Sequence, residues 1–257
     1  MTAKVLPIGS SVRQSVSREE WQTRVDLAAC YRLMSHAGVK DLTYNHLSAR
    51  VPGEPGHLLI KSGTMMFDEV SASNLQKYDF DGNPLQDSPR LRGGGLVIHA
   101  GILKARTDVN VVFHTHTPAN MGVSSQRDGL LMINQHALRF YKRIAYHTFG
   151  GFEFNMSQRD PLLASLGDKR IALLRNHGSL VCGRNIPEAF VEHHFLELAC
   201  QGQIAALSGN REVTLIPDDV CAYAVTQIVP EKPEDAGAKD WDACIRLAHR
   251  LDASFAE

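Results

Sequence analysis

The alternation of apolar and polar positions predicts a series of short strands along the chain. The clearest is Val111-Val112-Phe113, a brief apolar run rich in β-branched residues that leads directly into His114-Thr115-His116. Ile171-Ala172-Leu173-Leu174 resembles a buried strand in the same way and leads into Asn176-His177-Gly178. Further strands are expected over residues 42–51, 58–61, 77–80, 130–133 and 143–146.

Apolar residues at helical spacing predict several amphipathic helices between these strands. Ser17-Arg18-Glu19-Glu20 has the pattern of a capping box, and the helix that it opens is expected to end at Gly38. A short helix is expected after Ser71, and a long one from about Ile186 to Leu207. Other helices are expected over residues 97–103, 158–166 and 241–251.

The order of these elements indicates one large α/β domain. Strands and helices alternate loosely, and turn sequences such as Asp81-Gly82-Asn83-Pro84 are typical of hairpins. This pattern favours an α/β sandwich around a mostly antiparallel central sheet. We expect an N-terminal arm over residues 1–17, the domain over 18–212, and a C-terminal extension over 213–257. The extension is expected to pack on the same domain or on a neighbouring subunit.

Composition and charge exclude several classes of partner. The 257 residues are 44% hydrophobic and carry a net charge of -1, which argues against nucleic acid or an anionic membrane surface as a partner. No run is long enough for a membrane span, and residues 1–17 lack an apolar signal core. Five scattered cysteines without a CxxC pair are typical of free, mostly buried thiols in a reducing cytoplasm. We therefore expect a cytoplasmic protein that acts on a small molecule.

The two histidines at the end of the strand over 111–115 have the geometry of a metal site. Alternate side chains of a strand share a face, so His114 and His116 point the same way and Thr115 points the other. His177 follows a second strand, and neutral imidazoles suit Zn, Fe, Ni or Cu. Three such ligands leave coordination positions open for a substrate or water, and Asn176 is a candidate for orienting them. The alternative is that these are strand-end histidines bonded to the backbone.

These motifs together resemble the class II aldolase/adducin family. The matching segments span roughly residues 20–210 and are Tyr44-Asn45-His46-Leu47-Ser48-Ala49-Arg50, Ser62-Gly63, His99 with Ile102, Asp108-Val109-Asn110 before His114-Thr115-His116-Thr117, and Asn176-His177-Gly178. The resemblance implies a three-layer α/β/α sandwich and one divalent ion held by His114, His116 and His177. Zn is the expected ion, with Fe or Mn as alternatives. The resemblance also implies a homotetramer whose active sites lie between subunits.

The sequence departs from the sugar-phosphate aldolases of that family at three glycines. Those aldolases have Pro-Ser-Ser-Glu where this chain has Gly93, Gly94 and Gly95, so it lacks both the catalytic Glu and two phosphate-binding serines. His46 also replaces a phosphate-contacting Asn. The glycines, together with Phe67-Asp68-Glu69-Val70 and Gln135-His136-Ala137-Leu138-Arg139-Phe140-Tyr141, resemble the adducin-like bacterial branch. A non-phosphorylated substrate is therefore expected.

The resulting hypothesis is a divalent-metal-dependent lyase that cleaves or decarboxylates a small hydroxy- or oxo-acid. Candidate substrate-binding residues are His46, Ser62, Gly63 and Arg139, and candidate acid–base residues are His136 and Tyr146. Lys61 and Glu69 beside Ser62-Gly63 are interpreted as solvated charges. Two alternatives stay open: a non-haem Fe(II) oxygenase on the same three histidines, and a non-catalytic scaffold of the adducin kind.

Overall fold

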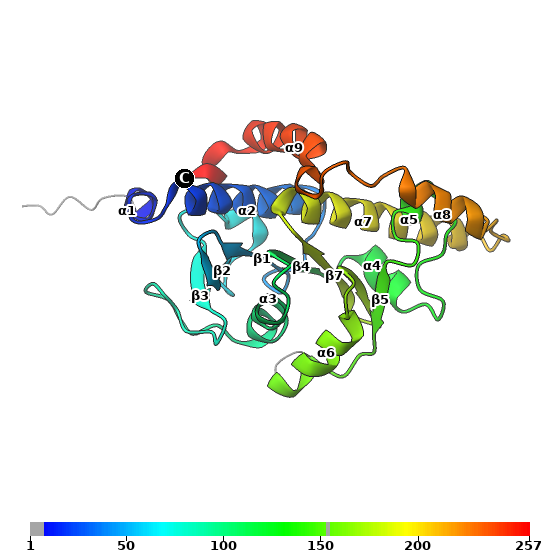
Figure 1. The fold of residues 1–257 in the computed structure, drawn as a ribbon, viewed down its shortest axis with the longest axis horizontal. Helices are drawn as coiled ribbons and strands as arrows, with labels where there is room; N and C mark the ends of the chain where they lie inside the picture. Colours follow the sequence, from blue (N-terminus) through cyan, green and yellow to red (C-terminus); the bar gives the residue numbers. More distant parts are fainter. Residues whose placement is uncertain (1–7, 153–154) are drawn as a thin grey trace, which may run out of the picture.

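A computed structural model describes residues 8–152 and 155–257 of the chain, and a seven-stranded sheet is at its centre (Figure 1). The strand order is β3-β2-β1-β4-β7-β6-β5, and every neighbouring pair is antiparallel except β5 and β6. The mostly antiparallel sheet expected from the sequence is confirmed. The strands are β1 (His46–Val51), β2 (Glu54–Ile60), β3 (Gln76–Asp79), β4 (Val111–Thr115), β5 (Ile144–His147), β6 (Ile171–Leu174) and β7 (Gly178–Gly183).

Helices cover both faces of the sheet, so the expected three-layer sandwich is also confirmed (Figure 1). The long helices α2 and α7 lie on one face, and α3 and α6 lie on the other. A π-helical turn over Gly95–Ala100 runs directly into α3, and such turns are frequent at functional sites. The helices are α1 (Ile8–Ser15), α2 (Arg18–His36), α3 (Gly101–Ala105), α4 (Pro118–Ser124), α5 (Gln135–Leu138), α6 (Arg159–Leu166), α7 (Ile186–Ser208), α8 (Asp218–Thr226) and α9 (Ala238–Leu251).

The central strand β4 divides its side chains between two hydrophobic cores. Val111 and Phe113 belong to the core beneath α2 and α7, whereas Val112 belongs to the core beneath α3 and α6. This alternation follows from the two-residue repeat of a strand. His114 therefore continues the face of Val112, and Thr115 continues the face of Phe113.

The start of α2 has half of the expected capping box. The Ser17 hydroxyl accepts a hydrogen bond from the Glu20 amide, as a capping serine should. The Glu20 carboxylate turns inward instead and pairs with Arg24 at 2.9 Å and with Lys77 at 2.9 Å. Burial explains the difference, because Glu20 is only 2% exposed and its charge needs cationic partners.

Several predicted elements differ from the structure. Residues 130–133 form no strand: Leu131 donates its amide to Gln203 and Leu130 donates to the Tyr146 hydroxyl, so tertiary bonds replace a ladder. Ser71 opens a turn rather than a helix, because its amide and carbonyl bond to Asn74. The strand predicted over 42–51 begins only at residue 46. Strand β7 and the helices α4, α5 and α8 were missed in the sequence.

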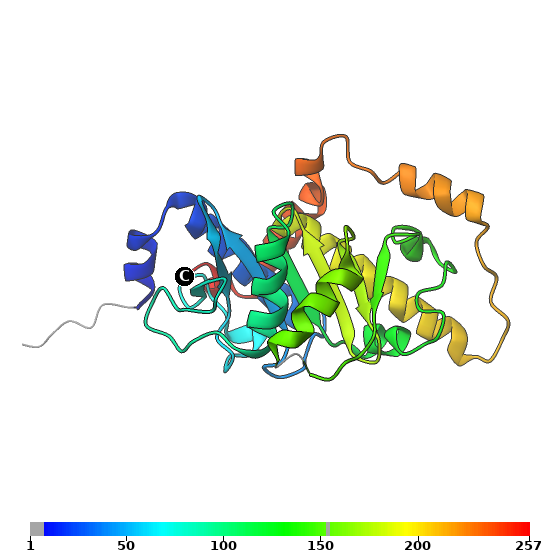
Figure 2. The same ribbon diagram turned by 60° about the horizontal axis from the view of Figure 1, so that its bottom comes forward.

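The segments outside the central domain pack on its helices to different extents. In the C-terminal extension, α9 packs against α2 and α7, and the last residues bond back to the body through Phe255 O and the Ala72 amide at 2.8 Å. Figure 2 shows α8 at the periphery, joined by extended connections. In the predicted N-terminal arm, residues 8–15 form α1, and residues 1–7 lie outside the described part of the chain.

The structure also tests the expectation about the cysteines. The five cysteines are free, and Cys244 alone among them is partly exposed, which confirms the prediction of mostly buried thiols. Within the described ranges, no helix combines the length and apolar character needed to cross a membrane.

Candidate metal centre

Three imidazole rings converge at one end of the sheet. The Nε2 atom of His116 lies 2.8 Å from that of His114 and 3.0 Å from that of His177. In the described part of the chain, these three residues are the one group of histidine, cysteine or carboxylate side chains whose ligand atoms meet closely enough to share an ion. The residues predicted to bind the metal therefore come together, although 61 positions separate His116 from His177.

The backbone around His177 is shaped to bring its ring beside β4. Asn176 adopts a left-handed conformation with φ 59°, and the His177 amide donates to Leu174 O at 3.0 Å, which closes a tight turn between β6 and β7. A side chain at Gly178 would have its Cβ 2.4 Å from Thr115 O. Glycine is therefore required where β7 begins, because only a bare Cα allows β7 to approach β4 so closely.

Neighbouring groups hold two of the rings in the tautomer that a metal requires. His114 Nδ1 lies 3.0 Å from Ser179 O, and His116 Nδ1 lies 2.7 Å from the Asp41 carboxylate. Both oxygens accept hydrogen bonds, so each Nδ1 carries the proton and each Nε2 keeps its lone pair. Burial, with a smaller effect of His116 and His177, lowers the pKa of His114 well below its usual value.

The donor set fits a divalent ion. Three imidazole nitrogens at 2.0–2.1 Å from a tetrahedral centre are about 3.3 Å apart, which is within a few tenths of an ångström of the spacing found here. Lone pairs crowded together without a cation repel each other, whereas an ion satisfies all three. Their chemistry suits Zn or another first-row metal, and three protein ligands leave a position open.

Asp41 was missed in the sequence, although it is the outer partner of His116. A lone carboxylate in a loop before β1 carries no motif, so only the folded structure brings it to the site. We expect Asp41→Asn to weaken metal affinity about 10- to 100-fold, because the amide holds the His116 tautomer less firmly. Titration of the metal-free protein with Zn²⁺ measures this, and an unchanged affinity in a folded variant would show that Asp41 has no such role.

The three histidines lie at the wall of an open cavity of about 600 Å³, which we call the imidazole cavity. Its lining consists of Asp41, Tyr44, His46, Gly94, Ile98, His114, His116, Met121, Phe149, Phe152, Asn176 and His177. The sequence analysis did not identify Phe149 and Phe152 as site residues. Their position in a glycine-containing loop directly after a strand is a signal that could have indicated them. A cavity of this size suits a small-molecule ligand.

His46, a predicted substrate-binding residue, lies in this cavity next to the metal ligands. Strand register places it directly opposite His114, and the two ring centroids are 5.7 Å apart. Burial lowers the pKa of His46 well below its usual value, so the ring is neutral at physiological pH. Its Nδ1 is buried and makes no hydrogen bond within the described residues. A neutral imidazole here can interact with a polar group of a ligand.

Gly94 and Gly95 leave space for neighbouring side chains. A Cβ at Gly94 would lie 2.9 Å from His46 Cε1, so the glycine allows His46 to occupy its position. A Cβ at Gly95 would lie 2.7 Å from Leu91 Cδ1. A glutamate at position 95 would therefore require Leu91 to move, and the packing is adapted to the missing carboxylate.

Lys61 is buried, contrary to its interpretation as a solvated charge. It is 3% exposed, and its ammonium group donates to Thr43 O at 2.9 Å and Ser62 O at 3.3 Å. Desolvation lowers the pKa of Lys61 to about 8. Two backbone carbonyls, one in the segment before β1 and one just after β2, thus hold the ammonium group inside. Glu69 is exposed, as expected, and accepts from the Met66 amide.

The other predicted site residues lie outside the imidazole cavity of the same chain. Ser62 bonds to Thr64 at 3.0 Å and precedes the exposed Gly63. Arg139 lies over the Phe195 ring and pairs with Glu192 at 3.5 Å, and His136 also contacts Phe195. Tyr146 accepts from the Leu130 amide and lies beneath Arg175. None of these residues lines the imidazole cavity, so the fold of one chain does not bring them to the histidines.

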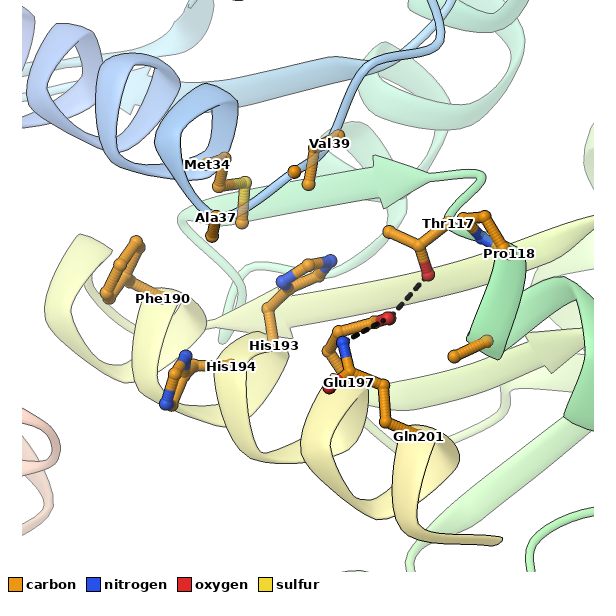
Figure 3. A pocket seen from close by; sticks show the side chains of 12 residues that line it. Met34, Ala37, Val39, Thr117, Pro118, Phe190, His193, His194, Glu197 and Gln201 are labelled. Atoms are coloured by element: carbon orange, nitrogen blue, oxygen red, sulfur yellow. Dashed lines mark hydrogen bonds between the residues drawn. The ribbon is translucent and has the colours of Figure 1, made fainter. Parts of the chain in front are cut away.

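A buried polar network supports the metal strand from the opposite face of the sheet. Thr115 bonds to His193 of α7 at 2.7 Å, to Ser179 at 3.1 Å and to Asn120 at 3.2 Å. A smaller cavity of about 220 Å³ lies beside His193, between α2, α4 and α7 (Figure 3). Ser179 also accepts from His114 through its carbonyl, so the network connects α7 to a metal ligand.

Buried neutral histidines make the metal-free protein sensitive to acid. Burial lowers the pKa of His99 to about 3 and that of His193 to about 4. Below pH 6.5 the unfolded chain protonates these residues and the folded chain does not, so the unfolded state binds more protons. Each histidine then lowers the free energy of unfolding by about 1.4 kcal/mol per pH unit as pH falls toward its folded pKa.

We therefore expect stability to urea to fall between pH 6.5 and 4 in the presence of a chelator. Asp26 acts in the opposite direction, because burial raises its pKa to about 6, and it partly offsets the loss. His99→Asn keeps a hydrogen-bond acceptor for Ser48, and it is expected to reduce the slope of the free energy of unfolding against pH. Equal slopes for the two proteins would rule out His99 as a source of the acid sensitivity.

Comparison with known proteins identifies close relatives. The family model for the Class II Aldolase and Adducin N-terminal domain matches residues 25–204. A protein of Pseudomonas aeruginosa named "Putative aldolase class 2 protein" is 40% identical over 259 residues, which cover 99% of both chains. The crystal structure of an aldolase II superfamily protein from Pseudomonas syringae has a TM-score of 0.90 and 42% identity, and the match covers 96% of this chain and 100% of that one.

Alpha-adducin of Rattus norvegicus is 35% identical over 220 residues, which cover 84% of this chain and 30% of the adducin. The similarity thus extends over nearly the whole chain in the bacterial proteins and over one part of the adducin. The three histidines of the candidate metal centre lie within the residues that the family model matches. The chain belongs to the class II aldolase and adducin family.

Proposed function

We propose that the protein is a divalent-metal-dependent lyase that cleaves or decarboxylates a small, non-phosphorylated hydroxy- or oxo-acid. The observation that carries this proposal is the convergence of the Nε2 atoms of His114, His116 and His177 on an open cavity. A scaffold has no need for three ring nitrogens directed at one point beside open space. Zn is the metal we propose, with Fe or Mn as the alternatives.

In this proposal the chain orients the acid and the ion supplies Lewis-acid polarisation of a carbonyl or hydroxyl group. Asp41 and Ser179 hold the ring tautomers of His116 and His114, and His46 interacts with a substrate oxygen beside them. Loss of CO2 needs no initial removal of a proton from carbon, so it is compatible with glycine at position 95. Ser62 and Gly63 remain proposed substrate contacts at the end of β2.

We further propose a homotetramer in which Tyr146, His136 and Arg139 act on the site of a neighbouring subunit. All three lie outside the imidazole cavity of their own chain. They can therefore act only at the imidazole cavity of a neighbouring subunit. Subunit mixing tests this. Tyr146→Phe and His116→Ala should each be inactive, and mixed oligomers should regain turnover, because some interfaces then combine an intact Tyr146 with an intact His116. Mixed oligomers without turnover would contradict action between subunits.

The decisive experiment for the function is metal analysis combined with turnover. The purified protein is expected to hold about one divalent ion per chain. When loaded with Zn or Mn, it should release CO2 or a cleaved carbonyl product from at least one hydroxy- or oxo-acid in a panel. Iron together with oxygen consumption would instead establish the oxygenase, and the lyase proposal would be abandoned.

A non-catalytic scaffold is the second candidate, and the similarity to alpha-adducin favours it. A scaffold should fold equally well without a metal and should show no affinity for Zn²⁺ above that of a His114→Ala variant. Micromolar or tighter metal binding that depends on His114 would exclude this candidate.

A further inference from the structure

The mouth of the imidazole cavity is built from apolar side chains that remain exposed. Phe152 is 69% exposed, Phe149 is 42% exposed and Tyr44 is 62% exposed, and all three line the cavity. Met121 in the middle of α4 completes this rim and is 37% exposed. Large apolar groups normally avoid water, so several of them around one cavity mark a surface that binds an apolar partner.

The aromatic rim is continuous with the metal-binding end. The Phe149 ring lies 5.8 Å from the His177 ring, edge to face, and 6.2 Å from the Phe152 ring. A ligand held by the three histidines therefore has Phe149 beside it and Phe152 further out. The two rings offer a path of apolar surface that leads away from the ion site.

Charge on the cavity wall excludes other kinds of tail. Among the described residues that line the cavity, Asp41 is the one carboxylate, and none is a lysine or an arginine. A second carboxylate or a phosphate beyond the chelating end would meet no lysine or arginine from the described residues of the same chain. With about 600 Å³ available, the cavity is also within the usual size range for ligands much larger than a three-carbon acid.

We infer that the substrate carries an aromatic or other extended apolar group beyond its metal-chelating end. This inference rests on the proposed function, because it takes the chelating end to be a hydroxy- or oxo-acid. The phenyl or alkyl tail packs on Phe149 and Phe152, and the head remains at His114, His116 and His177. The tail and not the acid then determines which substrate the enzyme selects.

Binding of matched acids to the Co²⁺-loaded protein tests the inference. Lactate, phenyllactate and 3-phosphoglycerate share a 2-hydroxy-acid head and differ in the tail, and the visible spectrum of Co²⁺ reports chelation. Phenyllactate is expected to bind about 10- to 100-fold more tightly than lactate, which is the effect of burying a phenyl ring. Phosphoglycerate is expected to bind no more tightly than lactate.

Substitutions locate the tail. Phe152→Ala and Phe149→Ala should each reduce the ratio of phenyllactate to lactate affinity toward one. Both side chains are exposed, so neither substitution removes a core contact. A circular dichroism spectrum that matches the parent shows that each variant is folded. Tyr223→Ala removes a ring of similar exposure on α8 and should leave the ratio unchanged.

The possible results separate the inference from the proposed function. Equal binding of lactate and phenyllactate, or tighter binding of phosphoglycerate, would overturn the inference and leave the metal-dependent lyase standing. A ratio that survives both phenylalanine substitutions would also overturn it. Binding of Co²⁺ without any spectral response to the acids would refute chelation, and the proposed function would fail together with the inference.

Discussion

Alanine in place of His116 is expected to lower the affinity for a divalent metal by at least about 100-fold and to abolish turnover. Substitution of a residue that merely orients a metal ligand already lowers metal affinity about 10- to 100-fold. The Nε2 atom of His116 lies close to those of both His114 and His177. Its Nε2 lies within 3.0 Å of both others, so the remaining pair cannot enclose an ion. Isothermal titration with Zn²⁺, together with metal analysis of the purified variant, measures the loss.

The matched control for this substitution is His36→Ala. His36 is an exposed histidine at the last turn of α2, away from the lining of the imidazole cavity. It should leave metal content and turnover unchanged. Retention of one tightly bound ion by the His116 variant would show that the three nitrogens are not the metal site, and the proposed function would lose its basis.

Loss of Arg24 should have the largest effect on stability among the charged residues of α2. Arg24 is 1% exposed, pairs with Glu20 and donates to Leu75 O at 2.8 Å. Arg24→Ala leaves the buried Glu20 carboxylate with Lys77 alone and removes the guanidinium donor from two backbone carbonyls, those of Ala72 and Leu75. Breaking a buried ion pair costs about 3–5 kcal/mol, and we expect a decrease of that size in the free energy of unfolding.

Urea denaturation of Arg24→Ala beside Lys104→Ala measures this contribution. Lys104 pairs with Asp81 at 2.8 Å, but both side chains are exposed. An exposed pair contributes about 0–1 kcal/mol, so the control should hardly change the midpoint. Similar losses in the two variants would mean that burial of the Glu20–Arg24 pair has no special importance for the fold.

The metal centre and the core depend on the same strand. β4 contributes Phe113 to the core beneath α2 and α7, and one residue later it contributes His114 to the imidazole cavity. The Thr115 network then ties this strand to α7. The ligands are thus positioned by the most buried part of the sheet, which favours a preorganised site, whereas the aromatic rim comes from loops and a short helix.

Local patterns were sufficient to predict the main elements that position the site. The apolar runs before His114 and His177 form β4 and β6, and the long helix after residue 186 is α7. These predictions succeed because strand and helix periodicities arise from neighbouring residues in the chain. The strand over residues 130–133 was wrongly predicted, because hydrogen bonds from its amides to Gln203 and Tyr146 override the local preference.

The sequence by itself determined the family, the mostly antiparallel sandwich and the three histidines, because the family motifs, the strand and helix periodicities and each histidine segment can be recognised within a few consecutive residues. Only the tertiary structure decided that Asp41 supports His116, that Lys61 is buried and that Phe149 and Phe152 form the cavity rim. It also separated Tyr146, His136 and Arg139 from the metal centre of their own chain. Contacts of this kind join residues far apart in the chain, and a loop sequence does not specify the direction in which its side chains point.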